Sequence, residues 1–153
     1  MSRAFVKETD ARTEELPDRP ISSHRNFVTE TGLAAIEASI GRFEAAHQAA
    51  TDKGDAQAAA AALREIRYWR TRRASAEVVR RSSDTRTASF GMTVALRRED
   101  GREQTFRIVG EDEADPLHGT VSYVSPLARA VLTYGPGDTV EIAGGTVVIL
   151  DVR

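Results

Sequence analysis

Apolar residues in the first half of the chain recur at the spacing of an α-helix. From Thr29 onward they follow one another at alternating steps of three and four residues, in a seam made of Leu33, Ile36, Ile40, Phe43, His47 and Ala50. Thr29 stands directly before this seam, where its hydroxyl oxygen can cap the first turn of a helix. The pattern predicts a helix with one narrow apolar face.

A second helical stretch follows a short turn. The sequence Asp52-Lys53-Gly54-Asp55 combines a glycine with two aspartates that favour turns, and Asp55 is placed to cap the next helix. From residue 56 to about residue 79 the chain returns to helix formers, with a second apolar seam at Leu63, Ile66, Trp69 and Ala76. Two seams of similar length predict an antiparallel helical hairpin over residues 28–80.

After a polar, aperiodic linker at residues 81–87, the hydrophobic period falls to two, which is typical of β-strands. Clusters of glycine, aspartate and proline separate the expected strands. One short helix is expected where Ser125 can act as N-cap and Pro126 takes the first helical position. The predicted fold class is α+β, with an N-terminal helical hairpin and a C-terminal antiparallel β domain at residues 88–153 carrying one short helix.

Composition narrows the possible functions. Residues 1–27 are polar and charged with few apolar positions, which predicts a disordered tail. The formal net charge of the 153-residue chain is −2, which argues against a general nucleic-acid binder. The absence of cysteine excludes disulfides and thiolate zinc sites. No apolar run is long enough to span a bilayer, so we expect no membrane contact and a cytoplasmic location.

Charge is unevenly divided between the two predicted helices. The second helix carries a basic stripe that includes Arg64, Arg67, Arg70 and Arg73. One interpretation is a solvated face with ion pairs across the hairpin, and the other is contact with nucleic acid or with an acidic protein channel. A cluster of carboxylates at Glu111, Asp112, Glu113 and Asp115 is interpreted as a solvated turn.

The C-terminal half also contains recognisable short segments in a definite order: Phe90-Gly91, Phe106 to Gly110, Glu111 to Asp115, Val124 to Leu132, and Gly137-Asp138. In order and spacing they resemble the FKBP-like domain of the GreA/GreB transcript-cleavage factors. Val28-Thr29 followed by Gly32-Leu33 resembles the family's entry into its helical arm, and Ala76 to Val79 resembles its exit. The resemblance covers approximately residues 28–153.

This resemblance implies a protein that docks on RNA polymerase at the secondary channel and points its hairpin inward. It places the docking residues at Ser125, Pro126, Leu127 and Arg129, and the hairpin tip at Asp52, Gly54 and Asp55. In cleaving members, two acidic tip residues help to hold Mg²⁺ so that the polymerase hydrolyses its own backtracked RNA. The chain itself would then not be an enzyme.

The tip departs from the family's pattern. Ala58 stands where cleaving members have a glutamate, and the arms look about a heptad shorter, which withdraws the tip by roughly 10 Å. The leading hypothesis is therefore a monomeric Gre-type elongation factor that modulates RNA polymerase without efficient cleavage and without a cofactor. RNA or DNA contact would come through the polymerase complex.

Three alternatives stay open. The first is a cleavage stimulator in which Asp52 and Asp55 bind Mg²⁺. The second is a short-arm protein that resembles the regulator of nucleoside diphosphate kinase. The third, prolyl isomerase activity, rests on the FKBP-like fold alone.

Overall fold

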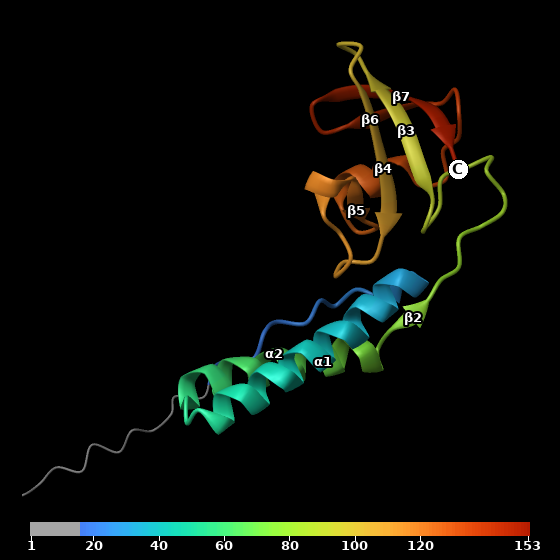
Figure 1. Cartoon of the computed structure of the whole chain (residues 1–153). Helices are drawn as coiled ribbons and strands as arrows, with labels where there is room; N and C mark the ends of the chain where they lie inside the picture. Colours follow the sequence, from blue (N-terminus) through green and yellow to red (C-terminus); the bar gives the residue numbers. More distant parts are fainter. Residues whose placement is uncertain (1–15) are drawn as a thin grey trace, which may run out of the picture.

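The computed structural model describes residues 16–153, and it consists of a helical hairpin joined by a linker to a small β domain (Figure 1). The predictions for residues 1–15 lie outside the described residues. Residues 16–26, which belong to the predicted disordered tail, instead run beside the hairpin without regular secondary structure. Within residues 16–153, no helix has the length and apolar character that a bilayer crossing requires.

The hairpin consists of α1 (Glu30–Asp52) and α2 (Ala56–Ala74), and both predicted caps are present. The Thr29 side chain accepts a hydrogen bond from the Gly32 amide, and the Asp55 side chain accepts one from the Ala58 amide. At about 1.5 Å per residue, the 23-residue α1 is roughly 34 Å long. Gly54, between the helices, has a φ of 69°, a conformation that favours glycine.

The end of α2 differs from the prediction. The helix ends at Ala74 rather than near residue 79, and Glu77–Val78 form strand β2, which pairs in parallel with β1 (Phe27–Val28). Tertiary hydrogen bonds override the helical pattern here, because the Glu77 amide donates to the Asn26 carbonyl and the Val79 amide to the Val28 carbonyl. The apolar seam of α2 also runs through buried Ala62 and Ile66, while Leu63 is 41% exposed.

The C-terminal domain is built on a five-stranded sheet in the order β5-β4-β3-β7-β6. Its strands are β3 (Thr93–Arg98), β4 (Glu103–Val109), β5 (Thr120–Ser122), β6 (Thr139–Ile142) and β7 (Gly145–Val152). Alternate strand residues pack against α3 (Pro126–Val131) to form the core. The predicted fold class is confirmed, with one departure: β4 and β5 pair in parallel, after the chain crosses back through the 3₁₀ helix η1 (Pro116–His118).

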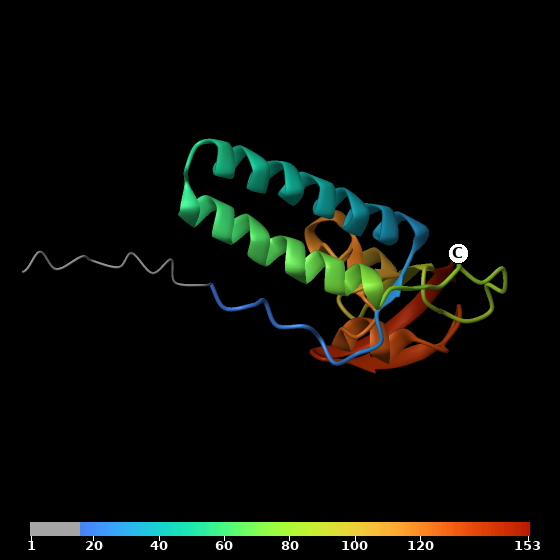
Figure 2. The same cartoon turned by 90° about the horizontal axis from the view of Figure 1, so that it is seen from below.

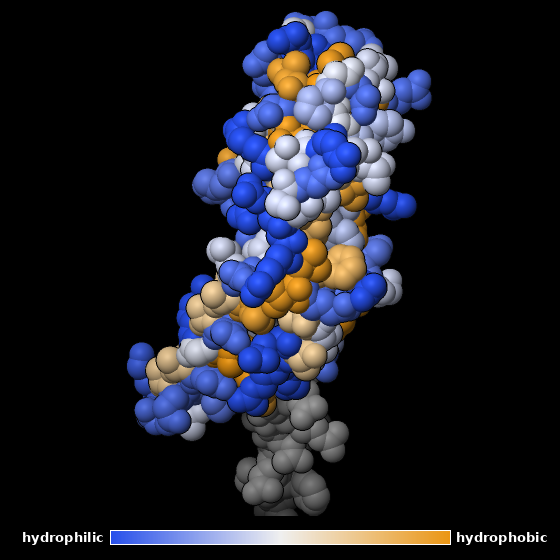
Figure 3. Space-filling model, turned by 90° about the vertical axis from the view of Figure 1, so that its right-hand side faces the viewer, coloured by the Kyte–Doolittle hydropathy of each residue, from blue (hydrophilic) through white to orange (hydrophobic). Residues whose placement is uncertain are grey.

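An aromatic cluster lies where the hairpin meets the β domain. The ring centroid of Phe27 is 6.1 Å from that of Phe90 and 5.2 Å from that of Tyr123. Figure 3 shows that hydrophilic residues cover most of the face it presents, while apolar residues gather near this junction. The two parts of the molecule therefore share a packed contact as well as a linker.

Gly110, at the end of β4, allows β1 to cross directly over the β domain. A Cβ atom at this position would collide with the Phe27 carbonyl oxygen, which is backbone and cannot move aside independently. Gly41, on α1, provides the opposite case, because no heavy atom lies within 4 Å of a Cβ built there.

We expect Gly110→Ala to lower the free energy of unfolding by about 1–3 kcal/mol, the usual cost of overpacking. The matched change Gly41→Ala should raise it by about 0.5–1 kcal/mol, because alanine is the better helix former. Urea unfolding followed by circular dichroism measures both values. Equal stability of the two variants would contradict the close crossing at Gly110.

Candidate functional site

The predicted docking residues lie on and beside α3. The Ser125 hydroxyl oxygen accepts a hydrogen bond from the Ala128 amide at 3.2 Å, so that Ser125 is the N-cap of α3. Pro126, at the first helical position, and Arg129, one turn later, are both exposed. Leu127 is half-buried and packs against the core. The N-terminal end of α3 is therefore fixed by the Ser125 cap and by the packing of Leu127, while Pro126 and Arg129 are accessible to solvent.

Two hollows flank this helix. A mainly apolar cleft of about 390 Å³ is lined by residues that include Ser125, Pro126, Leu127, Val121, Ile142 and Arg98. Arg129 lines a separate hollow of about 340 Å³, together with His24, Tyr123, Val124 and Leu132. The structure thus brings three of the predicted docking residues to one cleft and places the fourth at another.

Sequence reasoning missed the contribution of η1 to this surface. Pro116 lines the apolar cleft, and its neighbour Leu117 is 93% exposed, the most exposed large apolar side chain among residues 16–153. A 3₁₀ helix of three residues has no periodic signal in the sequence. The isolated leucine within a polar turn is the only hint that the sequence offers.

At the hairpin tip, both predicted carboxylates have local partners. Asp55 Oδ1 accepts from the Ala58 amide at 2.9 Å, and Asp52 Oδ1 accepts from Gln48 Nε2 at 2.8 Å. In the part of the chain that the structure describes, no group of three or more histidine, cysteine or acidic side chains could hold a metal ion. Mg²⁺ binding by Asp52 and Asp55 stays a prediction.

All four arginines of the basic stripe have partners within the chain. Arg70 pairs with Glu44 at 2.6 Å and Arg73 with Glu37 at 2.9 Å, and both pairs cross from α2 to α1. The other two face the N-terminal segment, where Arg64 Nε donates to the Pro17 carbonyl and Arg67 Nε to Asp18 Oδ1, each at 2.6 Å. The stripe is therefore engaged internally along its length.

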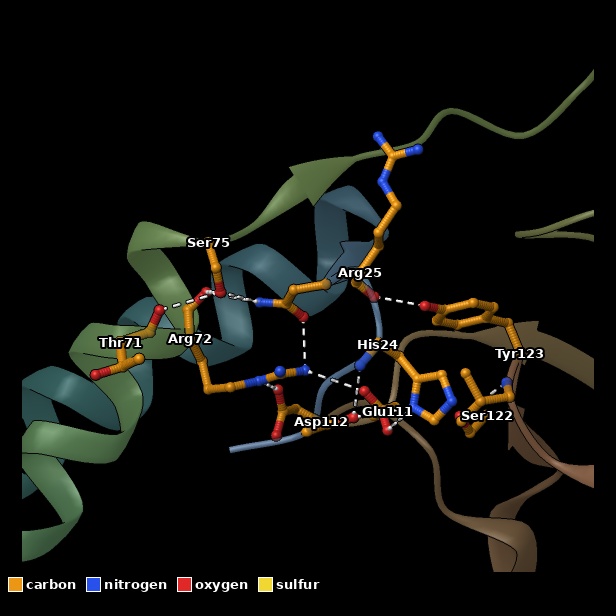
Figure 4. Close-up of polar contacts among 12 residues, drawn as sticks. His24, Arg25, Thr71, Arg72, Ser75, Glu111, Asp112, Ser122 and Tyr123 are labelled. Carbon is orange, nitrogen blue, oxygen red and sulfur yellow. Dashed lines mark hydrogen bonds and ion pairs between the residues drawn. The ribbon is translucent and has the colours of Figure 1, made fainter. Parts of the chain in front are cut away.

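A fifth arginine of the same helix has a different role. Arg72 is 2% exposed, and its Nε lies 2.5 Å from Asp112 Oδ2 in the loop that follows β4 (Figure 4). Its Nη2 donates to Asn26 Oδ1 at 2.6 Å and lies 3.7 Å from Glu111 Oε2. Asn26 Nδ2 donates in return to the Arg72 carbonyl at 2.7 Å. A buried guanidinium thus joins α2, the N-terminal segment and the β domain.

Neighbouring side chains extend this contact between the hairpin and the β domain. The Tyr68 hydroxyl donates to Asp112 Oδ1, and the Thr29 hydroxyl donates to Glu113 Oε2 at 2.6 Å. Burial, and then the hydrogen bond to Asp112, raise the pKa of Tyr68 to about 12, so the phenol remains a donor at neutral pH. The Tyr123 hydroxyl donates to the Arg25 carbonyl.

The interpretation of the acidic cluster as a solvated turn is wrong for Asp112 and Glu113, because both bind the hairpin. It describes Asp115 better, since its carboxylate forms an exposed pair with His118 at 2.6 Å. Arg72 follows Trp69 by three residues and so continues the apolar seam of α2. That spacing is the signal that could have identified it as a buried residue.

Residues 83–153 match the family described as transcription elongation factor GreA/GreB, C-terminal domain. The C-terminal part of the chain therefore carries a GreA/GreB-type domain. Transcription elongation factor GreB of Neisseria meningitidis serogroup B is 43% identical over 83 residues, which cover 52% of this chain and 50% of GreB. Transcription elongation factor GreA of Methylobacterium nodulans is 54% identical over 55 residues, or 35% of each chain. The chain thus spans about half or less of the length of these curated relatives.

Solved structures of Gre-type proteins are also similar to this chain. The transcription factor Gfh1 aligns over 86% of this chain and 99% of its own, with a TM-score of 0.42 and 18% identity. The GreA/GreB factor of Nitrosomonas europaea aligns over 84% and 98%, with a TM-score of 0.41 and 20% identity.

We expect Asp112→Asn to lower the free energy of unfolding by about 3 kcal/mol, because it leaves the Arg72 charge buried without its main partner. The control is Asp115→Asn, which removes an exposed carboxylate of the same loop and should change stability by no more than about 0.5 kcal/mol. Urea unfolding of both variants against the unchanged protein provides the comparison. Similar losses of unfolding free energy in the two variants would show that the Asp112–Arg72 contact contributes no more to stability than an exposed ion pair.

Proposed function

We propose that this Gre-family protein docks on RNA polymerase at the secondary channel through its β domain and modulates elongation without efficient transcript cleavage. The observation that carries the proposal is the accessible apolar cleft beside α3, on a domain that belongs to a family of transcription elongation factors. The relatives named above are elongation factors in their own right. The partner and its binding site are our inference for this chain.

The surface around α3 has the make-up of a docking site. Its centre is apolar, with Pro126, Leu127 and Ile142 around the cleft, and a charged residue, Arg98, also lines it. Small apolar centres with polar rims are common in protein interfaces. Exposed Leu117 adds an apolar side chain that a partner could cover.

The hairpin supports a role inside a channel. It is anchored at its base by the buried Arg72, and its tip lies at the far end from the β domain (Figure 1). A helix pair of roughly 30 Å held in a set direction can reach well beyond the docking surface. Such an arm can occupy a channel without supplying any chemistry of its own.

The hairpin tip has few side chains that could serve as ligands in metal-assisted hydrolysis. Metal ligands must lie within a few tenths of an ångström of their required distances. Asp55 is committed to capping α2, Asp52 is held by Gln48, and Ala58 offers no carboxylate where cleaving relatives have one. Any RNA hydrolysis in the complex would be the polymerase's own reaction.

Docking can be tested with Ser125→Asp combined with Pro126→Glu. Aspartate keeps the N-cap of α3 and glutamate suits the first turn, so the helix should persist while its outer edge becomes charged. We expect affinity for RNA polymerase core enzyme to fall by more than roughly tenfold in a quantitative pull-down, equivalent to about 1.4 kcal/mol.

The control for docking is Asp84→Asn combined with Arg86→Ala, which breaks an exposed ion pair in the linker. Its polymerase binding should be unchanged. Undiminished binding of the Ser125 and Pro126 variant would rule out this surface as the docking site. Retention of nucleoside diphosphate kinase in place of polymerase would support the kinase-regulator alternative.

Cleavage can be tested separately with Asp55→Ser, because serine keeps the cap of α2 but removes the carboxylate. With a stalled, backtracked elongation complex, we expect the unchanged protein and Asp55→Ser to give the same small amount of shortened RNA. Gel analysis of end-labelled transcripts measures it. Strong shortening by the unchanged protein that disappears in Asp55→Ser would establish a cleavage stimulator.

A further inference from the structure

The segment Leu16–Ser23, called the strap below, lies along the outer side of α2. Figure 2 shows it running beside α2 before the chain enters β1. It was predicted to belong to a disordered tail, yet it makes specific contacts with four positions of the helix, at residues 64, 65, 67 and 68. These contacts do not depend on the polymerase-docking surface, which lies on the other domain.

The polar contacts of the strap fall on charged residues of α2. Its Pro17 carbonyl oxygen accepts from Arg64 Nε, and its Asp18 carboxylate accepts from Arg67 Nε, both at 2.6 Å. Arg19 in turn pairs with Glu65 at 2.7 Å. Two arginines that would otherwise point from the helix toward solvent are thus occupied by oxygen atoms of the strap.

The strap also covers an aromatic pair. The Arg19 guanidinium lies 3.6 Å from the centroid of the Tyr68 ring and 5.6 Å from that of Trp69. The two rings meet edge to face, with centroids 5.0 Å apart. Together, Arg64, Arg67 and Tyr68 form a basic and aromatic surface of α2, named here the arginine–aromatic face, which the strap closes; Trp69 packs against the edge of Tyr68.

The arginine–aromatic face has the chemistry that single-stranded nucleic acids bind. Phosphate oxygens take up arginine donors, and bases stack on aromatic rings. The strap satisfies the same groups in the same way, with oxygens on two arginines and a planar group on Tyr68. Arg70 and Arg73 stay paired with α1, so Arg64 and Arg67 are the cations that release of the strap would free.

We propose that the strap is an intramolecular competitor that keeps the arginine–aromatic face closed until a single-stranded nucleic acid displaces it. Its contacts are partly exposed to solvent, and contacts of that kind are individually weak. The strap can therefore open without unfolding the hairpin, whose caps and inter-helix packing it does not supply. The proposal goes beyond polymerase docking and holds whether or not docking occurs.

The test uses the full chain and a short fluorescein-labelled oligouridylate. The release variant, Asp18→Asn with Arg19→Ala, removes the carboxylate from Arg67 and the guanidinium from Tyr68 without changing the net charge. We expect fluorescence anisotropy to show roughly tenfold tighter binding than for the unchanged chain, because a larger fraction of molecules is open. Asp18→Asn alone, which leaves Arg19 in place, should give a smaller gain of the same sign.

The control is Asp100→Asn with Arg102→Ala, which makes the same two substitutions in an exposed ion pair on the β3–β4 turn. It should bind like the unchanged chain. Adding Arg64→Ala and Arg67→Ala to the release variant should remove the gain. Trp69, the single tryptophan of the chain, should change its fluorescence when the oligonucleotide displaces the strap from the unchanged protein.

Two results would overturn the proposal. One is a release variant that binds the oligonucleotide no more tightly than the Asp100 and Arg102 control. The other is a gain in affinity that persists after Arg64 and Arg67 are replaced, since the binding would then lie on another surface. Failure of the polymerase pull-down would affect neither result, because this test contains no polymerase.

Discussion

The buried guanidinium of Arg72 is the interaction on which the arrangement of this protein depends. A charge removed from water is costly unless it is paired and hydrogen-bonded. Arg72 meets that requirement only where α2, the loop after β4 and Asn26 come together. The contacts of the Arg72 guanidinium therefore hold the hairpin, the N-terminal segment and the β domain in one relative position. The linker alone would permit many relative positions.

The consequence is a helical arm held in one orientation on the β domain. The aromatic cluster of Phe27, Phe90 and Tyr123 packs at the same junction, so apolar contact and charge pairing favour one orientation. The apolar cleft beside α3 and the arginine–aromatic face of α2 lie on different parts of the molecule. The two proposals, polymerase docking at the cleft and nucleic-acid binding at α2, therefore concern separate surfaces.

Much of the fold could be predicted from the sequence because periodicity and caps are local properties. Thr29, Asp55 and Ser125 all cap the helices that the pattern assigned to them.

The features that the sequence did not predict depend on partners that are distant in the chain. Strands β1 and β2 have two residues each, too few to show alternation, and they exist through pairing across about 50 positions. The spacing of Arg72 after Trp69 hints at burial, but its partner Asp112 lies 40 positions away and cannot be identified from the local pattern. Arg64 and Arg67 look free in the sequence because their partners, Pro17 and Asp18, belong to a segment with no apolar pattern.

The central claim is that the Arg72 contact holds the hairpin in one direction relative to the β domain. The chain contains no cysteine, so spin labels can be attached at Gly41→Cys on α1 and Glu103→Cys at the exposed start of β4. Double electron–electron resonance should give a single narrow distance distribution for the labelled protein and a broad one after Asp112→Asn. Distributions of equal width with and without the Asp112 carboxylate would contradict the claim.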